Sequence, residues 1–331
     1  MADHLSGYQA RDWDVVDYQM YQDPVSQLFF RGPQAGPLEP GRYIVCLGAA
    51  QTFGCFCEHP YPQLLEKELG MPVVNLGYGG AGPRFFVRHP ELLPLINDAA
   101  LVIVQVMSAR SEDNDRFVSD GLEYLTVRET GEKVSALKGY TDLLAEHDQR
   151  LRWMPPVARK LLRVVKGHPR VRRLLAQTRS NWVANYRDLF DQITAPTALL
   201  WFSRRTPGLH RTDRATWWWQ RYDDVNSMFG DYPQLVNRSM VKAIAPLADT
   251  VVEATTHRGS PQPLYSRFTG EPVDIDSSKD RPDLAKVRNY NPYYPSPQMH
   301  EDAAAVLLEP VRRLLGSTRA RAGEAAREGQ A

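Results

Sequence analysis

Positively charged side chains that could bind an anion follow several apolar runs of this sequence, at the points where those runs end. Arginine presents a planar fork of N–H donors that suits carboxylate, sulfate or phosphate. Helix N-termini at the same edge would add their positive ends. We therefore predict an anion-binding rim that comprises Arg84, Arg110, Arg204, Arg205, His257, Arg258 and His300. In the alternative interpretation, several of these side chains form structural ion pairs with Asp223, Asp224, Asp274 or Asp276.

Few side chains near this rim could act as a nucleophile or a base. Thr52 could approach the same crevice, or its hydroxyl could cap the following helix. Cys55 and Cys57 lie near that helix, whose N-terminus would lower a thiol pKa, although free cysteines are also commonly buried and inert. Ser108 could hydrogen-bond a ligand or cap a turn. His300 could act as a base toward water or an acceptor hydroxyl, or could be a capping or packing residue.

The elements that must position these residues are apolar runs that alternate with helical segments. The runs are typical of covered strands and span residues 43–47, 72–76, 100–107, 197–203 and 250–255. Helices are predicted between them, among others over 61–69, 233–247 and 300–315. This alternation predicts an α/β fold with a doubly wound, mainly parallel five-stranded sheet.

The turn after the first strand is where we place the site. Gly48, Ala49 and Ala50 are small enough for the backbone to fold sharply and leave room above the sheet edge. In open α/β sheets, ligands bind at the carboxyl ends of the strands. We therefore expect Ala50 to line the ligand crevice.

The chain divides into three parts. Residues 1–42 lack strong periodicity and are predicted to form an N-terminal extension, and 43–316 form the α/β domain. Residues 112–195 are too long for one crossover, whose minimum is about 10–12 residues, and are predicted to be an α-helical insertion. Residues 317–331 are small and charged and are predicted to be a disordered tail.

Two further segments have unusual composition. Residues 149–187 contain eleven Lys or Arg and no acidic residue. This stretch could lie on an anionic membrane or polymer as a peripheral contact, or form a solvated helical face near a partner's acidic surface. Trp217, Trp218 and Trp219, with Tyr222, could stack on sugar rings or anchor a long loop to the core.

The overall composition narrows the function classes. The net charge of +1 gives no reason to expect a nucleic-acid partner. Three cysteines do not make a disulfide framework, and the Cys55-x-Cys57 pair is too sparse for zinc, so no metal or cofactor is predicted. The N-terminus lacks the apolar core of a secretory signal, and no apolar run approaches the roughly 20 residues of a membrane span. We expect a soluble, cytoplasmic protein.

The order of the motifs resembles that of the SGNH, or GDSL-type, hydrolases. Residues 47–54, Leu-Gly-Ala-Ala-Gln-Thr-Phe-Gly, are similar to the first block of that family, Gly-Asp-Ser-x-Thr-x-Gly. Asn-Leu-Gly at 75–77 is similar to the second block, and 104–110 take the place of the third. Pro-Gln-Met-His at 297–300 is similar to the last, Asp-x-x-His. The layout is also similar to an uncharacterised bacterial domain family of SGNH type.

This resemblance implies a flavodoxin-like SGNH fold over roughly residues 25–315, with Gly77 as oxyanion donor and His300 as base. The sequence departs from the family at three positions. The nucleophilic serine falls at Ala50, the triad aspartate at Pro297 and the oxyanion asparagine at Ala109. Because ester hydrolysis of this type needs an activated oxygen nucleophile, we do not expect an ordinary serine esterase.

Three functions remain as predictions. The first is an SGNH-like protein that acts on an anionic, carbohydrate-linked ligand by hydrolysis or group transfer, in a non-standard reaction with His300 as base, Gly77 as oxyanion donor and the arginines as a clamp. The second is a catalytically inactive protein that binds an anionic small molecule, an acidic glycan or a partner. The third is a transferase with a sulfo or phospho donor, in which the acceptor hydroxyl is the nucleophile and Ala50 is no handicap.

Overall fold

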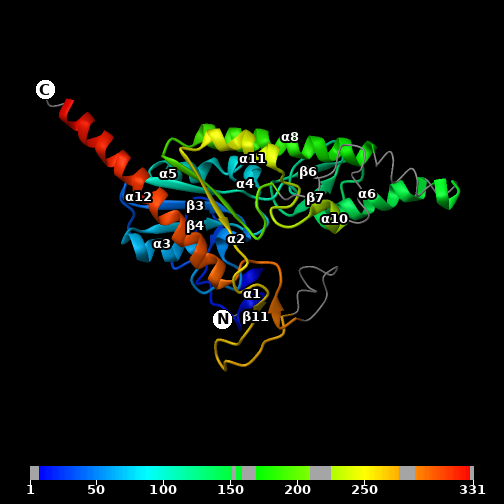
Figure 1. Ribbon diagram of the computed structural model, residues 1–331, viewed down its shortest axis with the longest axis horizontal. Coiled ribbons are helices and arrows are strands. Elements are labelled where there is room, and N and C mark those ends of the chain that lie inside the picture. Colours follow the sequence, from blue (N-terminus) through cyan, green and yellow to red (C-terminus); the bar gives the residue numbers. More distant parts are fainter. Residues whose placement is uncertain (1–6, 151–153, 159–168, 209–224, 276–287, 329–331) are drawn as a thin grey trace.

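The computed structural model describes residues 7–150, 154–158, 169–208, 225–275 and 288–328 (Figure 1). Trp217 to Trp219 and Tyr222 lie outside the described residues, and so do residues 151–153 and 159–168 of the basic stretch. Across the described chain, no helix combines the length and the apolar composition needed to cross a membrane.

The centre of the molecule is a five-stranded sheet in the order β10-β9-β5-β3-β4. Its strands are β3 (Ile44–Gly48), β4 (Val73–Gly77), β5 (Leu101–Gln105), β9 (Thr197–Ser203) and β10 (Thr250–Thr255). Every neighbouring pair is parallel. All residues of β3, β4, β5 and β9 are buried, which explains why they read as continuous apolar runs. The predicted fold class is confirmed.

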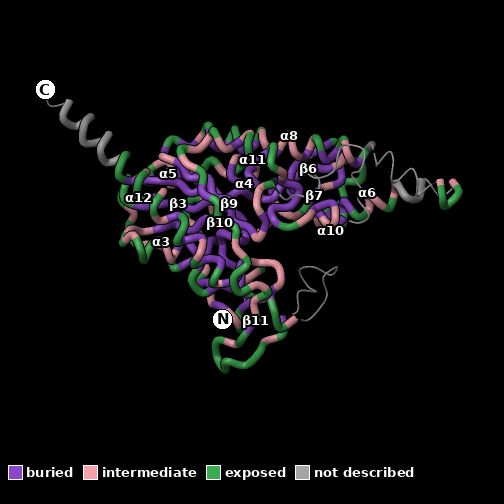
Figure 2. Tube along the Cα trace, in the orientation of Figure 1, coloured by how far each residue is buried: buried purple, intermediate pink, exposed green. Residues whose placement is uncertain are grey.

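Helices cover both faces of the sheet, so it is doubly wound. On one face, α3 (Tyr61–Leu69) and α12 (Pro297–Glu328) pack on the side chains that alternate strand residues direct toward them. The other face is covered by α4 (Pro83–Val87), α5 (Leu93–Asn97), α8 (Pro169–Gln192) and α11 (Arg238–Ile244). Figure 1 shows these two layers on either side of the sheet, and Figure 2 shows that buried residues concentrate between them.

The insertion is only partly helical, which corrects the sequence prediction. It begins with an antiparallel sheet of β6 (Phe117–Ser119), β7 (Tyr124–Val127) and β8 (Lys133–Ser135), and continues as α6 (Ala136–Arg150) and α8. Strands of three or four residues are too short to give a readable alternation of apolar and polar residues. Their turns are marked by Gly121 and Gly131, which have φ angles of 83° and 72°.

The C-terminal helix α12 also differs from the prediction, because it continues through Gly316 to Glu328. Gly316 is followed by helix-forming residues, and a single glycine in a helix costs only about 1 kcal/mol. The remaining short elements are α1 (Tyr8–Asp12), β1 (Tyr21–Gln22), β2 (Phe29–Phe30), α2 (Ala50–Phe53), η1 (Pro90–Leu92), α10 (Val225–Phe229), η2 (Ala245–Leu247), β11 (Gln262–Pro263) and β12 (Tyr290–Asn291).

Candidate functional site

The turn after β3 is fixed by contacts that only glycine permits. A Cβ at Gly48 would lie 2.1 Å from Thr52 Oγ1 and 2.4 Å from Gln105 Oε1. Gln105 Oε1 in turn accepts hydrogen bonds from the backbone N–H of Ala49, at 3.0 Å, and from Thr52 Oγ1, at 2.7 Å. This network holds the start of α2 against the end of β5 and presents Ala50 at the sheet edge.

Gly77, at the end of β4, is fixed in the same way. A Cβ at this position would lie 2.2 Å from the backbone nitrogen of Phe53. The N–H of Gly77 donates to Asn75 Oδ1 at 2.9 Å, and Asn75 Nδ2 donates to the carbonyl of Thr52 at 3.0 Å. Since this N–H already has a partner inside the protein, the geometry does not offer it to an oxyanion, contrary to the role that the resemblance implies.

A pocket of about 1080 Å³ opens at the carboxyl edge of the sheet. Its walls come from the turns after β3 and β4, the residues after β5 and β9, helix α1, the insertion and residues 288–294. Six residues that the sequence assigned to the site line this pocket: Ala50, Gly77, Ser108, Arg110, Arg204 and Arg205. The topology therefore brings these six together.

Thr52 does not face this pocket. Its side chain is fully buried, and its Oγ1 contacts the Tyr61 hydroxyl at 3.0 Å as well as Gln105. Because the hydroxyl is held by buried partners on both sides, Thr52 is not placed to attack a ligand. It does not cap α2 either, since Ala49 occupies the cap position and no side chain caps that helix.

His300 is likewise buried and is not among the residues that line the pocket. Its Nδ1 accepts a hydrogen bond from the backbone N–H of Tyr61 at 3.1 Å, and its ring stacks on the ring of Tyr61. Burial, together with the charge of Arg31, lowers the pKa of His300 to about 3. The imidazole is therefore neutral and interior, and the predicted base is not placed to act on a ligand in the pocket.

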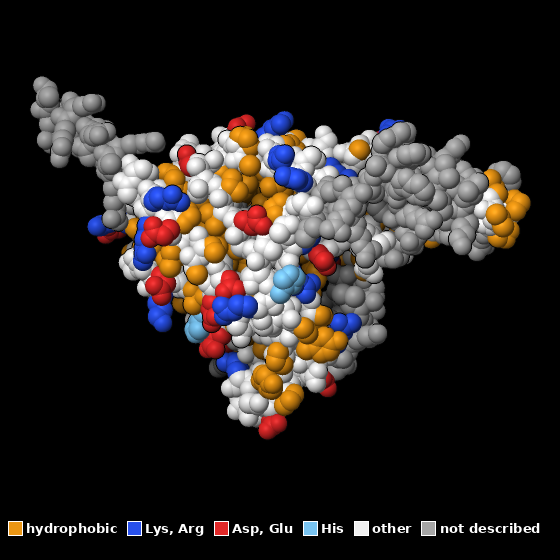
Figure 3. Space-filling view, in the orientation of Figure 1, with side chains coloured by type: hydrophobic (Ala, Val, Ile, Leu, Met, Phe, Trp, Pro, Cys, Tyr) orange, Lys and Arg blue, Asp and Glu red, His pale blue; other side chains and the backbone are white. Residues whose placement is uncertain are grey.

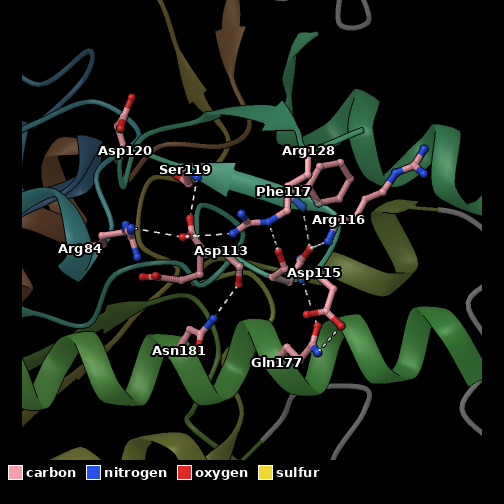
Figure 4. Close-up of polar contacts among 12 residues, drawn as sticks. Arg84, Asp113, Asp115, Arg116, Phe117, Ser119, Asp120, Arg128, Gln177 and Asn181 are labelled. Atoms are coloured by element: carbon pink, nitrogen blue, oxygen red, sulfur yellow. Dashed lines mark hydrogen bonds and ion pairs between the residues drawn. The ribbon is translucent and has the colours of Figure 1, made fainter. Parts of the chain in front are cut away.

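Three further members of the predicted rim do not line the pocket. Arg84 points toward Asp113, with Nη2 at 3.2 Å from Oδ2 (Figure 4). His257 is exposed and does not line the pocket. Arg258, also outside the pocket, forms ion pairs with Glu301 at 2.8 Å and Asp302 at 2.5 Å. These carboxylates are not the ones that the alternative interpretation named, of which Asp223, Asp224 and Asp276 lie outside the described residues.

The three arginines that do line the pocket have different surroundings. Arg205 is a structural residue, because its Nη2 donates to the carbonyls of Pro233 and Val236 and its guanidinium lies 4.9 Å from the ring of Trp201. Arg204 donates through Nη1 to the carbonyl of Pro292 at 2.8 Å. Arg110 is only 8% exposed.

The Arg110 guanidinium lies close to one acidic group, with Nη2 at 3.5 Å from Glu123 Oε1. Burial lowers the pKa of Arg110, but Glu123 together with Tyr293, Tyr294 and Tyr8 outweighs burial, so the pKa lies above its usual value and the charge is retained. The hydroxyl of Ser108 donates to the carbonyl of Gln234 at 3.3 Å and accepts from the N–H of Arg110 at 3.4 Å. Ser108 thus supports the pocket wall beside Arg110.

Cys55 and Cys57 are buried, and burial disfavours the ionised, reactive form of their thiols. Burial raises the pKa of Cys55 well above its usual value and that of Cys57 to about 12, although the nearby charge of Arg31 opposes the shift. Both therefore remain protonated thiols near neutral pH, which favours the interpretation as inert buried residues.

Several pocket residues could not be assigned from the sequence. Tyr8 and Arg11 come from α1, in a segment without periodicity, and Tyr293 and Tyr294 come from a loop near the C-terminus. Glu123 comes from the insertion. The Tyr8 and Tyr294 rings are 6.1 Å apart, so two segments that are far apart in the sequence meet at this pocket. The one sequence feature that could have indicated these residues as part of a pocket is the Pro- and Tyr-rich composition of residues 292–295.

The described residues that line the pocket carry an excess of positive charge. Among them are five arginines and two acidic residues: Arg11, Arg110, Arg204, Arg205 and Arg288, with Glu123 and Asp231. On the face that Figure 3 shows, by contrast, acidic and basic side chains are interspersed, and the whole chain has a net charge of only +1. Among the described residues, the lining of the pocket is therefore more positive than the surface that Figure 3 shows.

The topology defines an α/β protein of flavodoxin-like type, with a pocket at the carboxyl edge of its sheet. The family model described as "Domain of unknown function (DUF6473)" matches residues 7–119 and 158–315, and the chain belongs to this family. No curated protein matches the chain.

Several solved structures are similar at low identity. A carbohydrate esterase family 2 enzyme with a carbohydrate binding domain, from Corynascus thermopiles (Myceliophthora fergusii), is 13% identical with a TM-score of 0.38, over 85% of this chain and 69% of that chain. A putative acylhydrolase from Bacteroides fragilis is 13% identical with a TM-score of 0.36, over 86% and 92%. The acetylxylan esterase Axe2 from Geobacillus stearothermophilus is 14% identical with a TM-score of 0.35, over 84% and 95%. With TM-scores this low, these likenesses do not extend to a function for this chain.

Proposed function

We propose that this protein binds an anionic, carbohydrate-linked ligand in the pocket at the carboxyl edge of the sheet, and that it does not hydrolyse the ligand by serine-esterase chemistry. The observation that carries this proposal is the position of Arg110. Its side chain is 10% exposed, lines the pocket and has its ion-pair partner, Glu123, at 3.5 Å. A largely buried guanidinium that lines a pocket favours an anion there.

The other arginines that line the pocket contribute to its preference for an anionic ligand to different degrees. Arg11 is compensated by Asp12, with Nε at 2.5 Å from Oδ1, and Arg205 is bound to backbone carbonyls. Arg204 and Arg288 lie on the wall with residues 290–294. Charges enclosed by a protein wall interact more strongly than charges in bulk water, so this excess raises the affinity for anions.

Aromatic side chains support the carbohydrate part of the proposal. In the described part of the chain, seven tyrosines line the pocket: Tyr8, Tyr78, Tyr124, Tyr232, Tyr290, Tyr293 and Tyr294. A tyrosine offers an apolar ring face, on which the C–H face of a sugar can pack, and a hydroxyl that can donate or accept a hydrogen bond. A pocket of about 1080 Å³ is large enough for more than one sugar unit.

The arrangement around Ala50 supports binding without hydrolysis. Ala50 lines the pocket where the resemblance places the nucleophile, and alanine has no reactive oxygen. His300 is buried and neutral, and the N–H of Gly77 is engaged by Asn75. Each of the three parts of an esterase mechanism is therefore either missing or used inside the protein.

Isothermal titration calorimetry on the full chain tests the proposal with a sulfated disaccharide, a uronic-acid disaccharide and neutral cellobiose. We expect the two acidic sugars to bind at least about tenfold more tightly than cellobiose, and Arg110→Gln to remove most of this difference. Arg42→Gln is the matched control, because Arg42 is paired with Glu39 on the exposed surface. Equal affinity for all three sugars, or an unchanged Arg110→Gln variant, would refute the proposal.

A second measurement addresses hydrolysis. We expect release of p-nitrophenol from p-nitrophenyl acetate to be the same for the wild type and for His300→Ala, because the buried imidazole takes no part. A wild-type rate well above that of the variant would show that the site is an esterase after all.

A further inference from the structure

Two glutamines in the wall of the pocket have an amide oxygen that no group of the described structure satisfies. Gln51 and Gln234 line the pocket and are 2% and 5% exposed, and the Oε1 atom of each is buried without a hydrogen-bond partner. We propose that these two oxygens accept hydrogen bonds from hydroxyl groups of the ligand and so select a ligand with a hydroxylated sugar ring. This inference rests on the proposed function and deepens it, because it names the side chains that recognise the carbohydrate part.

The other buried glutamines of the described chain, Gln9 and Gln105, are satisfied through both amide atoms. Gln9 accepts from a backbone N–H at 2.7 Å and donates to a backbone carbonyl at 3.3 Å. Gln105 accepts two hydrogen bonds through Oε1 and donates to the Tyr232 hydroxyl at 3.0 Å. Neither lines the pocket. Since a buried acceptor without a donor is unfavourable, the two unsatisfied amides at the pocket call for a donor from outside the chain.

The backbone around Gln51 is fixed, although its amide is not. The N–H groups of Thr52 and Phe53 both donate to the carbonyl of Ala49 at 3.0 Å, and the carbonyl of Phe53 accepts from Arg31 Nη1 at 3.1 Å. The torsion about the last bond of a glutamine side chain is broad, and turning it breaks no hydrogen bond of the Gln51 oxygen. Gln51 therefore offers an adjustable acceptor from a rigid turn.

Gln234 is held from the opposite wall. Its backbone carbonyl accepts from the N–H of Ala109 at 3.0 Å, next to Arg110, and its Nε2 donates to the Tyr293 hydroxyl at 2.7 Å. The donor of this amide is therefore used inside the protein, while its acceptor is left without a partner. This places an unsatisfied acceptor in the segment that contacts the chain beside the anion-binding arginine.

The two walls are joined by the side chain of Gln105. Its Oε1 accepts from the N–H of Ala49, two residues before Gln51, and its Nε2 donates to the hydroxyl of Tyr232, two residues before Gln234, each at 3.0 Å. Ala49 and Tyr232 also line the pocket. The segments that carry the unsatisfied oxygens are thus linked through one side chain, so one ligand in the pocket can contact both.

The chemistry of an amide oxygen defines what it recognises. It accepts hydrogen bonds and cannot donate them, so its partner must carry an O–H or N–H group. The hydroxyl groups of a sugar ring supply such donors. An acid on a ring without hydroxyls would leave both oxygens buried and unpaired, and sites built to bond a hydroxyl strongly reject analogues that lack it.

The binding experiment compares glucuronate with tetrahydropyran-2-carboxylate by calorimetry, because the two share the ring and the acid group and differ in the hydroxyls. For the wild type, we expect glucuronate to bind about tenfold or more tightly. Gln51→Met and Gln234→Met should each weaken glucuronate by about fivefold or more and leave the affinity for tetrahydropyran-2-carboxylate unchanged or higher. Gln22→Met, at an exposed position of β1, is the matched control and should bind both probes as the wild type does.

Thermal unfolding without ligand separates recognition from structural support. Because the Gln51 oxygen has no partner to lose, Gln51→Met should unfold at the same temperature as the wild type or at a higher one. Gln105→Met removes an amide that is fully engaged and should lower the melting temperature by about 2 °C or more. A Gln51→Met protein that melts as low as Gln105→Met, with glucuronate affinity unchanged, would make Gln51 a structural residue and refute its proposed role.

The remaining outcomes distinguish this inference from the proposed function. If the wild type binds both acids equally well, the anion site stands and the inference is wrong. If either methionine variant keeps the wild-type preference for glucuronate, the role assigned to that glutamine is wrong. If the wild type binds neither acid, the inference and the proposed function both fail.

Discussion

The Nδ1 atom of His300 accepts a hydrogen bond from the backbone N–H of Tyr61 at 3.1 Å, and both residues are fully buried. Since Nδ1 is the acceptor, the proton of the neutral ring resides on Nε2. The Tyr61 hydroxyl contacts Thr52, and Thr52 donates to Gln105. Residues that the sequence assigned to chemistry thus form part of the internal support of the pocket.

His300 should make the free energy of unfolding decrease as the pH falls below about 6.5. Its pKa is about 3 in the folded protein and 6.5 in the reference state, so between these values the unfolded chain binds a proton that the folded chain does not. Stability is therefore fully present above about pH 6.5 and falls as the pH drops toward 3, by up to about 1.4 kcal/mol per pH unit. Urea unfolding at pH 7 and pH 5 measures this fall.

The matched variant is His300→Asn, which can still accept the N–H of Tyr61 but does not titrate. Its loss of stability between pH 7 and pH 5 should be smaller than that of the wild type by about 1 kcal/mol or more. Parallel pH profiles for the two proteins would contradict the buried, neutral state of this ring.

Thr52→Val tests whether the hydroxyl at this position is structural. Valine has nearly the same shape, but it removes the hydrogen bonds to Gln105 and Tyr61 in a fully buried place. We expect the free energy of unfolding to fall by about 1–3 kcal/mol, measured by chemical denaturation. Thr269→Val, at an exposed turn, should change it by less than about 0.5 kcal/mol. A Thr52→Val protein as stable as the wild type would remove the support for this network.

Gly77→Ala and Gly316→Ala should have effects of opposite sign. A Cβ at Gly77 would lie 2.2 Å from the backbone nitrogen of Phe53, and backbone atoms cannot move away as a side chain can. At Gly316, inside α12, nothing lies within 4 Å of an added Cβ. We expect thermal unfolding to show a loss of at least about 2 kcal/mol for the first variant and a gain of about 0.5–1 kcal/mol for the second. Two losses of equal size would contradict the close approach at Gly77.

Whether a feature of this structure can be predicted from the sequence depends on how far apart in the chain the interacting residues lie. The strands could be recognised because each is a buried apolar run that ends at a turn, and parallel topology then places Ala50, Gly77 and Arg110 at one edge. The direction of the His300 side chain is decided by packing on Tyr61, which spacing along the chain does not encode. Tyr8 reaches the pocket from a segment with no periodicity at all.

Glu112 is a buried carboxyl group that should make stability change with pH in the opposite direction to His300. Its side chain is fully buried, and its Oε2 accepts a hydrogen bond from Asn185 Nδ2 at 2.5 Å. Burial raises the pKa of Glu112 to about 8, although the hydrogen bond from Asn185 opposes the shift. Near neutral pH the group is therefore protonated in the folded protein.

The sign of the effect follows from the protons bound in each state. Between about pH 4.5 and 8, the folded protein holds a proton on Glu112 that the unfolded chain has lost, so stability declines as the pH rises through this window. Glu112→Gln keeps the shape and the acceptor but cannot ionise, and its stability should decline less between pH 5 and pH 8, by at least about 1 kcal/mol. Urea unfolding at both pH values, with Glu39→Gln as the exposed control, measures the difference. If wild type and Glu112→Gln lose stability in parallel over this range, the carboxyl group is already ionised in the folded state, and Arg84 rather than a proton must neutralise it.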